Sequence, residues 1–144
     1  MKIRNATYLD AAAIKSLMGA LGYKKTTSLL VDQLENLFGR DDHVVFVYEL
    51  NKDILGFISV HFMPQLAFDG GLVFISYLSV DEMVKDHPIA KALEDHVCKE
   101  ARKRKYDRIQ VHCMDWRTPA HKFYEQLGYQ LYPNFYTKRL IYGE

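Results

Sequence analysis

Three apolar runs follow one another in the middle of the chain, and they limit the fold more than any other feature of the sequence. HVVFVYEL (His43–Leu50), ILGFISVHFM (residues 54–63) and LVFISYLSV (Leu72–Val80) are rich in β-branched and aromatic residues, which favour strands. Because only NKD separates the first two runs, they predict an antiparallel hairpin. The third run is apolar on both faces, so it is expected in the middle of a sheet and not at its edge.

Helix patterns and a further strand precede these three runs. KIRNAT predicts an opening strand, and Asp10 is placed to cap a helix that ends at Gly22. A second helix is predicted to stop at Gly39. Both helices carry an apolar stripe at helical spacing: Ile14, Leu17, Met18 and Leu21 in the first, and Leu30, Leu34, Leu37 and Phe38 in the second.

The chain after Val80 alternates between helices and strands. A helix is predicted around residues 89–101, RIQVHC reads as a strand, PAHKFYEQLGY as a short helix closed by Gly128, and residues 134–142 as a last strand. A strand, a helix and a strand in this order imply a right-handed parallel crossover. The predicted fold class is therefore α/β (α+β), a single domain over residues 1–144. It has a mixed, mostly antiparallel twisted sheet of roughly six to seven strands, with about four helices on both faces.

Length, charge and cysteine content exclude several classes of protein. The 144 residues fit one domain, and a net charge of +1 gives no field that would attract nucleic acid or an acidic membrane. No apolar run reaches the ~18 residues of a membrane helix and no signal peptide is recognisable, so we expect a cytoplasmic protein. Cys98 and Cys113 form no CxxC pair or His/Cys cluster, which argues against structural zinc and fits small buried hydrophobic residues.

The turn after the Leu72–Val80 run is the first place where chemistry is expected. VDEMVKDHPIAKALEDHV (residues 80–97) reads as a strand end, a polar turn and a helix. The opening turn of a helix offers unpaired N–H groups and a partial positive charge, and a pyrophosphate suits such a site. Tyr124, one turn into the last predicted helix, is the second candidate, although its helical spacing from Ala120 and Leu127 also fits a packed core tyrosine.

These two stretches, in this order, resemble those of the GNAT superfamily, the acyl-CoA-dependent N-acyltransferases. KDHPIA aligns with the family signature R/Q-x-x-G-x-G/A, so that Lys85, Pro88 and Ala90 stand at its fixed positions. YLSV resembles the strand that pairs with the cofactor, and AHKFYEQLGY resembles the late A-x-x-x-Y-x-x-x-G-F/Y segment. IRNATYLDAAAIKSLM is similar to the usual opening of the family, so the resemblance runs from about Ile3 to Leu140.

The resemblance implies an N-acetyltransferase that uses acetyl-CoA and transfers the acetyl group directly, in a ternary complex, to a primary amine of a small molecule or peptide. The resemblance is compatible with a homodimer. In the segment Leu78, Ser79 and Val80, the backbone groups of Leu78 and Val80 would hold pantetheine. An N–H near Val80 would polarise the thioester carbonyl. The pyrophosphate would lie on the N–H groups of His87, Ile89, Ala90 and Lys91. Tyr124 matches the general acid of the family, and Arg117 belongs to an R-x-x-A-H-x-F-Y pattern with cofactor or helix-cap contacts.

Two residues depart from the family signature. Lys85 keeps a positive charge but lacks the planar fork of arginine. Pro88 has no N–H to donate, and the loss of one hydrogen bond to a charged group, ~1.5–3 kcal/mol, would weaken cofactor binding by roughly one to two powers of ten. Proline also suits the first helical position, so we expect Pro88 to begin the helix, with Asp86 or His87 as its cap.

The general base and the acceptor stay open at this level. Four residues stand on or beside elements that are expected near the cleft: His61, Asp69, Asp115 and His121. Acceptor choice is expected in residues 23–27 and in the apolar loop at residues 63–71, although simple packing is the stronger explanation for that loop. One alternative to the enzyme is a GNAT-fold binding or regulatory module with a weakened CoA site. A more distant one is a nucleic-acid-binding module built on KEARKRK (residues 99–105), a run that cations at a helix C-terminus also explain.

Overall fold

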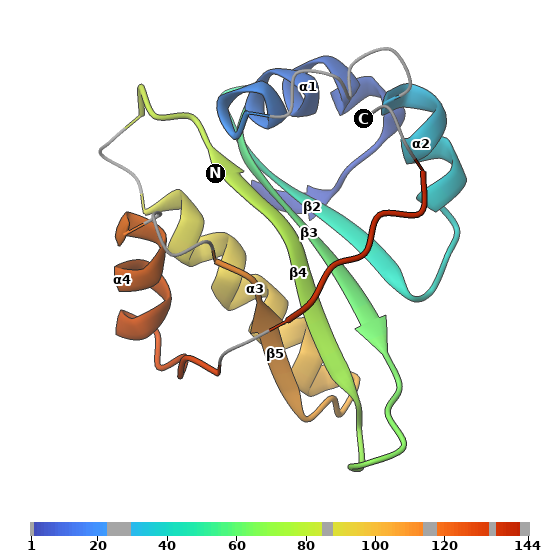
Figure 1. Ribbon diagram of the computed structural model, residues 1–144. Helices are drawn as coiled ribbons and strands as arrows, with labels where there is room; N and C mark the ends of the chain where they lie inside the picture. Colours follow the sequence, from blue (N-terminus) through green and yellow to red (C-terminus); the bar gives the residue numbers. More distant parts are fainter. Residues whose placement is uncertain (1, 23–29, 85–87, 114–117, 133–134, 142–144) are drawn as a thin grey trace. The chain divides into compact units, whose positions relative to one another are not determined.

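The computed structural model describes residues 2–22, 30–84, 88–113, 118–132 and 135–141. The chain divides into two compact units, Met1–His112 and Cys113–Glu144. The first unit contains the described sheet and the helices α1, α2 and α3, and the second contains α4 (Thr118–Gln126) (Figure 1). In the described part of the chain, every helix is too short or too polar to cross a bilayer.

The sheet of the first unit confirms the predicted hairpin, the central strand and the parallel crossover. Its strand order is β1 (Lys2–Asn5), β2 (His43–Leu50), β3 (Asp53–Met63), β4 (Leu72–Val80) and β5 (Arg108–Val111). The first four strands pair antiparallel, and β4 pairs parallel with β5. Asn51 and Lys52, with φ of 52° and 70°, form the tight turn between β2 and β3, which matches the twist of a hairpin.

The prediction of six to seven strands is wrong, because the described residues form a sheet of five strands. The pattern of residues 134–142 predicts a last strand, yet residues 135–141 form no ladder. Tyr136, Leu140 and Ile141 are 100%, 82% and 75% exposed. β-propensity reports how well a residue fits a pleated surface, and it does not specify the partner strand that a ladder requires.

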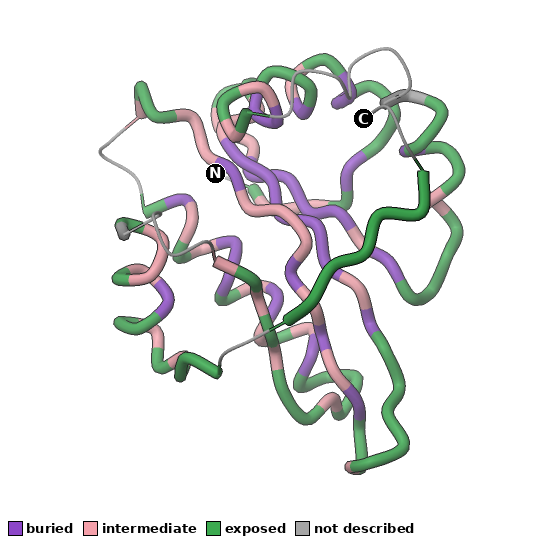
Figure 2. The backbone as a smooth tube through the Cα atoms, viewed as in Figure 1, coloured by how far each residue is buried: buried purple, intermediate pink, exposed green. Residues whose placement is uncertain are grey.

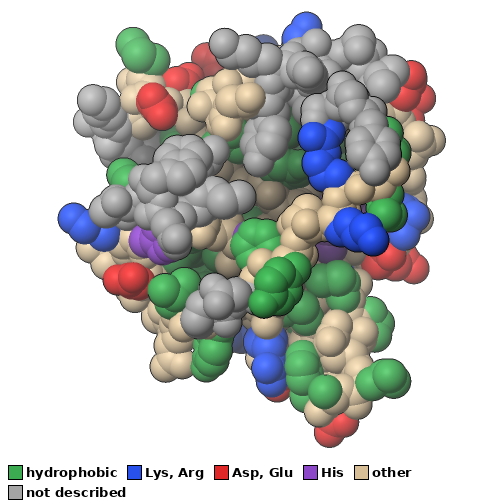
Figure 3. All heavy atoms as spheres, viewed as in Figure 1, with side chains coloured by type: hydrophobic (Ala, Val, Ile, Leu, Met, Phe, Trp, Pro, Cys, Tyr) green, Lys and Arg blue, Asp and Glu red, His purple; other side chains and the backbone are tan. Residues whose placement is uncertain are grey.

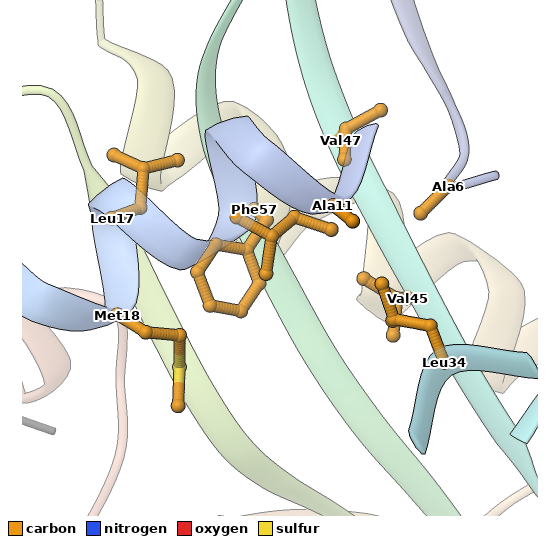
Figure 4. Packing of buried hydrophobic residues seen from close by; sticks show 9 residues of the cluster. Ala6, Ala11, Leu17, Met18, Leu34, Val45, Val47 and Phe57 are labelled. Atoms are coloured by element: carbon orange, nitrogen blue, oxygen red, sulfur yellow. The ribbon is translucent and has the colours of Figure 1, made fainter. Parts of the chain in front are cut away.

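Helices cover both faces of the sheet. α1 (Ala11–Ala20) and α2 (Leu30–Leu37) pack on one face, where Val45, Val47 and Phe57 lie in an apolar cluster with residues of both helices (Figure 4). Phe46 alternates with these β2 residues and meets His96 of α3 edge-on, with ring centroids 4.5 Å apart, so α3 (Ile89–Lys103) lies on the opposite face. Figure 2 shows the buried runs along β2, β3 and β4 between these helices.

Asp10 has a different role from the predicted helix cap. Its side chain makes no capping hydrogen bond to α1. Instead its carboxylate accepts the N–H of Thr7 at 2.8 Å, closing a capping box around the short 3-10 helix η1 (Tyr8–Asp10), and accepts two bonds from Arg4 at 2.8 and 3.0 Å. Arg4 also donates to Glu49 at 2.9 and 3.1 Å. This network ties β1, η1 and β2 together.

The two cysteines are half-buried and form no disulfide. Burial raises the pKa of the Cys98 thiol to about 12, and the thiol donates to Glu94 at 3.2 Å. Cys98 is therefore an unreactive packing residue. Among the described residues, no group of three or more His, Cys, Asp or Glu side chains could hold a metal ion.

Candidate functional site

The parallel strands β4 and β5 separate part of the way along β4. Their ladder joins Leu72 with Arg108 and continues as far as Ile75 with Val111. Residues 76–80 of β4 have no ladder partner on that side in the described part of the chain. The strand therefore presents an open edge, here called the open edge of β4 (residues 76–80), to which an extended ligand can pair (Figure 1).

A β-bulge stands where this open edge begins. Ser59 of β3 is opposite Tyr77, while the next β3 residue, Val60, is opposite Ile75. Ser76 is thus an extra residue in β4. A bulge bends its strand and increases the local twist, which explains why β4 leaves β5 directly after Ile75.

The backbone of β4 directs alternate residues toward the open edge. The N–H of Asp81 donates to the carbonyl of Leu55 on the β3 side at 2.7 Å. Because backbone groups alternate in an antiparallel ladder, those of Ser79 also face β3, and those of Leu78 and Val80 face the open edge. The Ser79 hydroxyl donates to the carbonyl of Leu17 in α1 at 2.9 Å, so its side chain holds a helix in place.

The N-terminus of α3 offers three backbone donors. The first α-helical bond joins the Ala92 N–H to the Pro88 carbonyl at 3.0 Å, so the N–H groups of Ile89, Ala90 and Lys91 have no partner inside the helix. Pro88 is the N-cap, with φ −77° and ψ 66°. The prediction that it is the first helical residue is wrong by one position, because its ψ is not helical. The predicted residues Lys85, Asp86 and His87 lie outside the described residues.

Gly56 allows α3 to begin close to the sheet. A Cβ at this position would lie 2.8 Å from Cγ2 of Ile89, 3.1 Å from Cγ1 of Val80 and 3.2 Å from the carbonyl oxygen of Ser79. Ile89 is only 2% exposed. Gly56 is not among the site residues predicted from the sequence, although a glycine inside a strand pattern indicates a close backbone approach.

Two histidines and two serines form a hydrogen-bonded chain on the sheet, here called the His–Ser chain (His43, Ser59, Ser76 and His61). His43 Nε2 lies 2.8 Å from Ser59 Oγ, and His61 Nε2 lies 3.1 Å from Ser76 Oγ. Ser76 Oγ lies 2.9 Å from Ser59 Oγ and 3.0 Å from the Ser59 carbonyl oxygen. Of these four residues, only His61 is a candidate from the sequence. The hydrogen bonds between side chains of neighbouring strands cannot be read from the order of residues.

Both histidines of the His–Ser chain are neutral near pH 7. Burial lowers the pKa of His43 to about 4, and burial also lowers the pKa of His61. The imidazole rings lie 4.5 Å apart, so a charge on one would disfavour a charge on the other. A neutral imidazole can accept a proton, as a general base must.

The loop at residues 63–71 lies at the other end of β4, and its last residues contact the segment that follows α3. A Cβ on Gly70 would lie 2.6 Å from the Lys105 carbonyl, and one on Gly71 would lie 2.9 Å from the Tyr106 ring. The Arg108 guanidinium lies 3.7 Å from the centroid of the Phe68 ring. These contacts hold the end of the loop, from Phe68 to Gly71, against neighbouring residues, whereas residues 63–67 are exposed. Leu66 is fully exposed, and Figure 3 shows hydrophobic side chains gathered at the tip of this hairpin.

The other candidates for the base lie in the loop before β4, in the second unit or outside the described residues. Asp69 is exposed in the same loop, which precedes β4, whereas Val80 and the α3 N-terminus follow the strand. Asp115, the cofactor candidate Arg117 and the acceptor candidates at residues 23–27 lie outside the described residues. His121 is half-buried on α4 of the second unit.

Tyr124 is a buried residue of α4 in the second unit, 8% exposed. Its ring meets those of Phe123 and Tyr129, with centroids 5.0 and 5.2 Å away. Its carbonyl accepts the N–H groups of Leu127 and Tyr129, which ends the helix before Gly128 at φ 94°. The predicted short helix and its glycine stop are confirmed.

Comparisons with known proteins agree with this architecture. The sequence profile described as the acetyltransferase (GNAT) family matches residues 11–129. No curated protein sequence gives a significant match. A transcriptional regulator from Bacillus halodurans C-125 has a similar structure, with 21% identity and a TM-score of 0.85, over 96% of this chain and 99% of that chain.

Two acetyltransferases are also among the similar structures. AAC(6')-Iy, in complex with the bisubstrate analogue CoA-S-monomethyl-acetylneamine, is 17% identical with a TM-score of 0.81, over 96% of this chain and 97% of that chain. Ribosomal-protein-alanine N-acetyltransferase from Brucella melitensis biovar Abortus 2308 is 18% identical with a TM-score of 0.78, over 97% and 100% of the two chains. At these identities the structures show a shared fold.

Proposed function

Because the chain belongs to the GNAT acetyltransferase family, we propose that it transfers an acetyl group from acetyl-CoA to a primary amine of a small molecule or peptide. The transfer is direct, within a ternary complex of protein, acetyl-CoA and amine. One observation carries the proposal: the open edge of β4 ends at Val80, and α3 begins shortly afterwards at Ile89 with N–H groups that have no partner inside the helix.

The backbone of β4 and α3 fits a CoA thioester. Acetyl-CoA supplies an acetyl group activated by a thiol leaving group. Leu78 and Val80 present backbone groups for the pantetheine arm, and their N–H groups can polarise the thioester carbonyl. Ile89, Ala90 and Lys91 donate N–H groups to the pyrophosphate at the positive end of the helix dipole. Lys85, His87 and Arg117 complete the proposed site.

The amine class follows from the family and from two relatives of the same fold. The name of the Brucella enzyme specifies the alanine of a ribosomal protein, and the analogue bound to AAC(6')-Iy contains an acetylated neamine. Both acceptors are amines. For this chain, an aminoglycoside and a peptide with an N-terminal alanine are therefore suitable first acceptors. 2-Phenylethylamine serves as a primary alkylamine that carries an aromatic ring.

Thermal unfolding with and without acetyl-CoA tests the proposal. A ligand at a hundred times its dissociation constant stabilises the folded state by ~2.7 kcal/mol, so millimolar acetyl-CoA should raise the unfolding midpoint. Release of free thiol in the presence of the three amines then tests transfer. If acetyl-CoA leaves the midpoint unchanged, the enzyme proposal fails, and the alternative of a GNAT-fold binding module without a working CoA site takes its place.

Pro88→Gly is expected to bind CoA more tightly than the wild type. A glycine restores the N–H that proline lacks, and a hydrogen bond to a charged group is worth ~1.5–3 kcal/mol, or roughly one to two powers of ten in affinity. Isothermal titration with CoA measures the change, and Pro64→Gly, in the loop that precedes β4, is the matched control. Weaker binding by Pro88→Gly would mean that the fixed φ of the proline supports the site.

Tyr124→Phe is expected to slow turnover while sparing CoA affinity. We propose that the Tyr124 hydroxyl gives its proton to the departing thiolate. General acids contribute about 10²–10⁴-fold, and because a thiol with a pKa near ~8.5 leaves readily, a loss at the lower end is expected. Steady-state kinetics measure it against Tyr129→Phe, a neighbouring tyrosine without this role. An unchanged rate would remove Tyr124 from the mechanism.

A further inference from the structure

The contacts of Ser76 determine which atom supplies the hydrogen between His61 and Ser76. The Ser59 carbonyl can only accept, so the Ser76 hydroxyl must donate to it. The Ser76 hydroxyl also donates to Ser59 Oγ at 2.9 Å, so its single hydrogen points toward Ser59. The hydrogen of the 3.1 Å contact between His61 and Ser76 must therefore come from Nε2 of His61.

The His61 imidazole is therefore held as the Nε2–H tautomer, with the lone pair on Nδ1. Among the described residues, Nδ1 of His61 has no hydrogen-bond partner. A proton that arrives at this nitrogen leaves the Nε2–H bond to Ser76 intact. The chain thus orients His61 in the form that accepts a proton at Nδ1.

Exposure distinguishes the two histidines. His43 is 7% exposed and directly follows the turn that carries Arg40 and Asp42, whereas His61 is half-buried. Placing a charge on the more deeply buried ring is more costly. His61 is therefore the member of the chain that can exchange a proton with a ligand or with water, and His43 with the two serines fixes its orientation.

The His–Ser chain stands where the proposed site requires chemistry. Ser76 is the bulge residue at which the open edge of β4 begins. If the pyrophosphate lies at the start of α3, the pantetheine arm runs back along β4 from Val80 to Leu78, and its reactive end points toward Ser76. Ser59 and His61 come two and four residues after Phe57 of the apolar cluster, so they lie on the face of the sheet that carries α1 and α2.

From this arrangement we propose that His61 is the general base of the acetyl transfer, and that the acceptor amine approaches the open edge of β4 on the face that carries α1 and α2. This inference rests on the proposed function. The amine nitrogen forms a bond to the acetyl carbon while the carbon–sulfur bond breaks. The nitrogen becomes acidic as its bond forms, and its proton passes to Nδ1 of His61 and then to water. The thiolate takes its proton from Tyr124, which is recharged from water.

Kinetics of His61→Gln test the assignment. Glutamine can still donate a hydrogen bond to Ser76 but cannot take up a proton at neutral pH. With the best acceptor among the three amines, kcat is expected to fall about a hundredfold or more, while the stabilisation by acetyl-CoA is retained. His96→Gln, a half-buried histidine on the opposite face, should keep the wild-type kcat.

The pH profile separates a base from a structural residue. The charged and titratable groups around His61 are His43 on β2 and Arg40 and Asp42 in the preceding turn. Wild-type kcat should fall on the acid side with an apparent pKa below the usual 6.5 of histidine, and His61→Gln should lose this limb. Ser76→Ala should lower kcat by less, and Ser76→Thr, which keeps the hydroxyl, should restore it.

Nitrogen-15 spectra of the histidine rings give a measurement that does not depend on activity. At neutral pH, His61 is expected as the neutral Nε2–H tautomer, with its signal identified by its loss in His61→Gln. The Nδ1–H tautomer, or a His61→Gln rate equal to that of the wild type, would overturn the assignment of His61 alone. A wild type that neither binds acetyl-CoA nor acetylates any of the three amines would instead overturn the proposed function.

Discussion

Gly56→Val is expected to weaken CoA binding about tenfold or more and to lower the free energy of unfolding by about 1–3 kcal/mol. The new Cβ would lie 2.8 Å from Ile89 and 3.1 Å from Val80, which are the first residue of α3 and the last of β4. The helix start must move away from the sheet to relieve these contacts. Loss of one aligned N–H donor to the pyrophosphate, ~1.5–3 kcal/mol, already accounts for the expected change in affinity.

Titration calorimetry with CoA and thermal unfolding measure the two effects of Gly56→Val. Gly56 is not among the glycines with positive φ, so the expected damage comes from contact and not from backbone strain. Gly19→Ala is the matched control, because a Cβ there meets no atom within 4 Å and alanine favours a helix over glycine. Gly56→Ala should show a smaller change in the same direction. Wild-type CoA affinity in a folded Gly56→Val protein would contradict the role of this close approach.

The sequence predicts the elements whose own residues determine them. The bounds of β2 and β4 match the predicted runs, and α1, α2 and α4 are followed by glycines with positive φ at Gly22, Gly39 and Gly128. Alternation, helical spacing and glycine stops are local signals. They also carry the family motifs, and the match of the GNAT profile over residues 11–129 confirms the resemblance.

The features that the sequence did not predict depend on contacts between distant residues. The sequence pattern predicts that the Asp10 carboxylate caps α1, but Arg4 of β1 and the N–H of Thr7 donate to it instead. The bulge at Ser76 depends on the register between β3 and β4. The sequence of the two strands does not determine this register to within one residue. The His–Ser chain joins residues 17 positions apart for the same reason. The candidate site is therefore only half visible in the sequence: the turn proposed to bind pyrophosphate is a local feature, whereas the bulge and the proposed base depend on distant residues.

Asp10→Asn is expected to destabilise the protein by about 3 kcal/mol at neutral pH, or roughly 6–12 °C in the unfolding midpoint. The Asp10 side chain is 6% exposed and accepts two bonds from Arg4, which is 25% exposed. Removing the charge of Asp10 leaves the partly buried Arg4 guanidinium with less negative charge beside it. Arg4 retains its ion pair with Glu49. Asp42→Asn, in the exposed pair with Arg40, is the control and should leave the midpoint unchanged.

The pH dependence of the stability difference between the wild type and Asp10→Asn identifies the ion pair as its cause. The hydrogen bonds from Arg4 hold the pKa of Asp10 below its usual value in the folded state. Asp10 therefore binds fewer protons when folded than when unfolded, and its contribution is present in full above the unfolded pKa of about 3.9. The contribution is lost as the pH falls through the folded pKa. Denaturant unfolding of the wild type and Asp10→Asn should thus differ by a constant amount from neutral pH down to about pH 5, and the two curves should converge below about pH 4. A difference that persisted unchanged into that acid range would mean that Asp10 stabilises the fold through packing and neutral hydrogen bonds, and not through its charge.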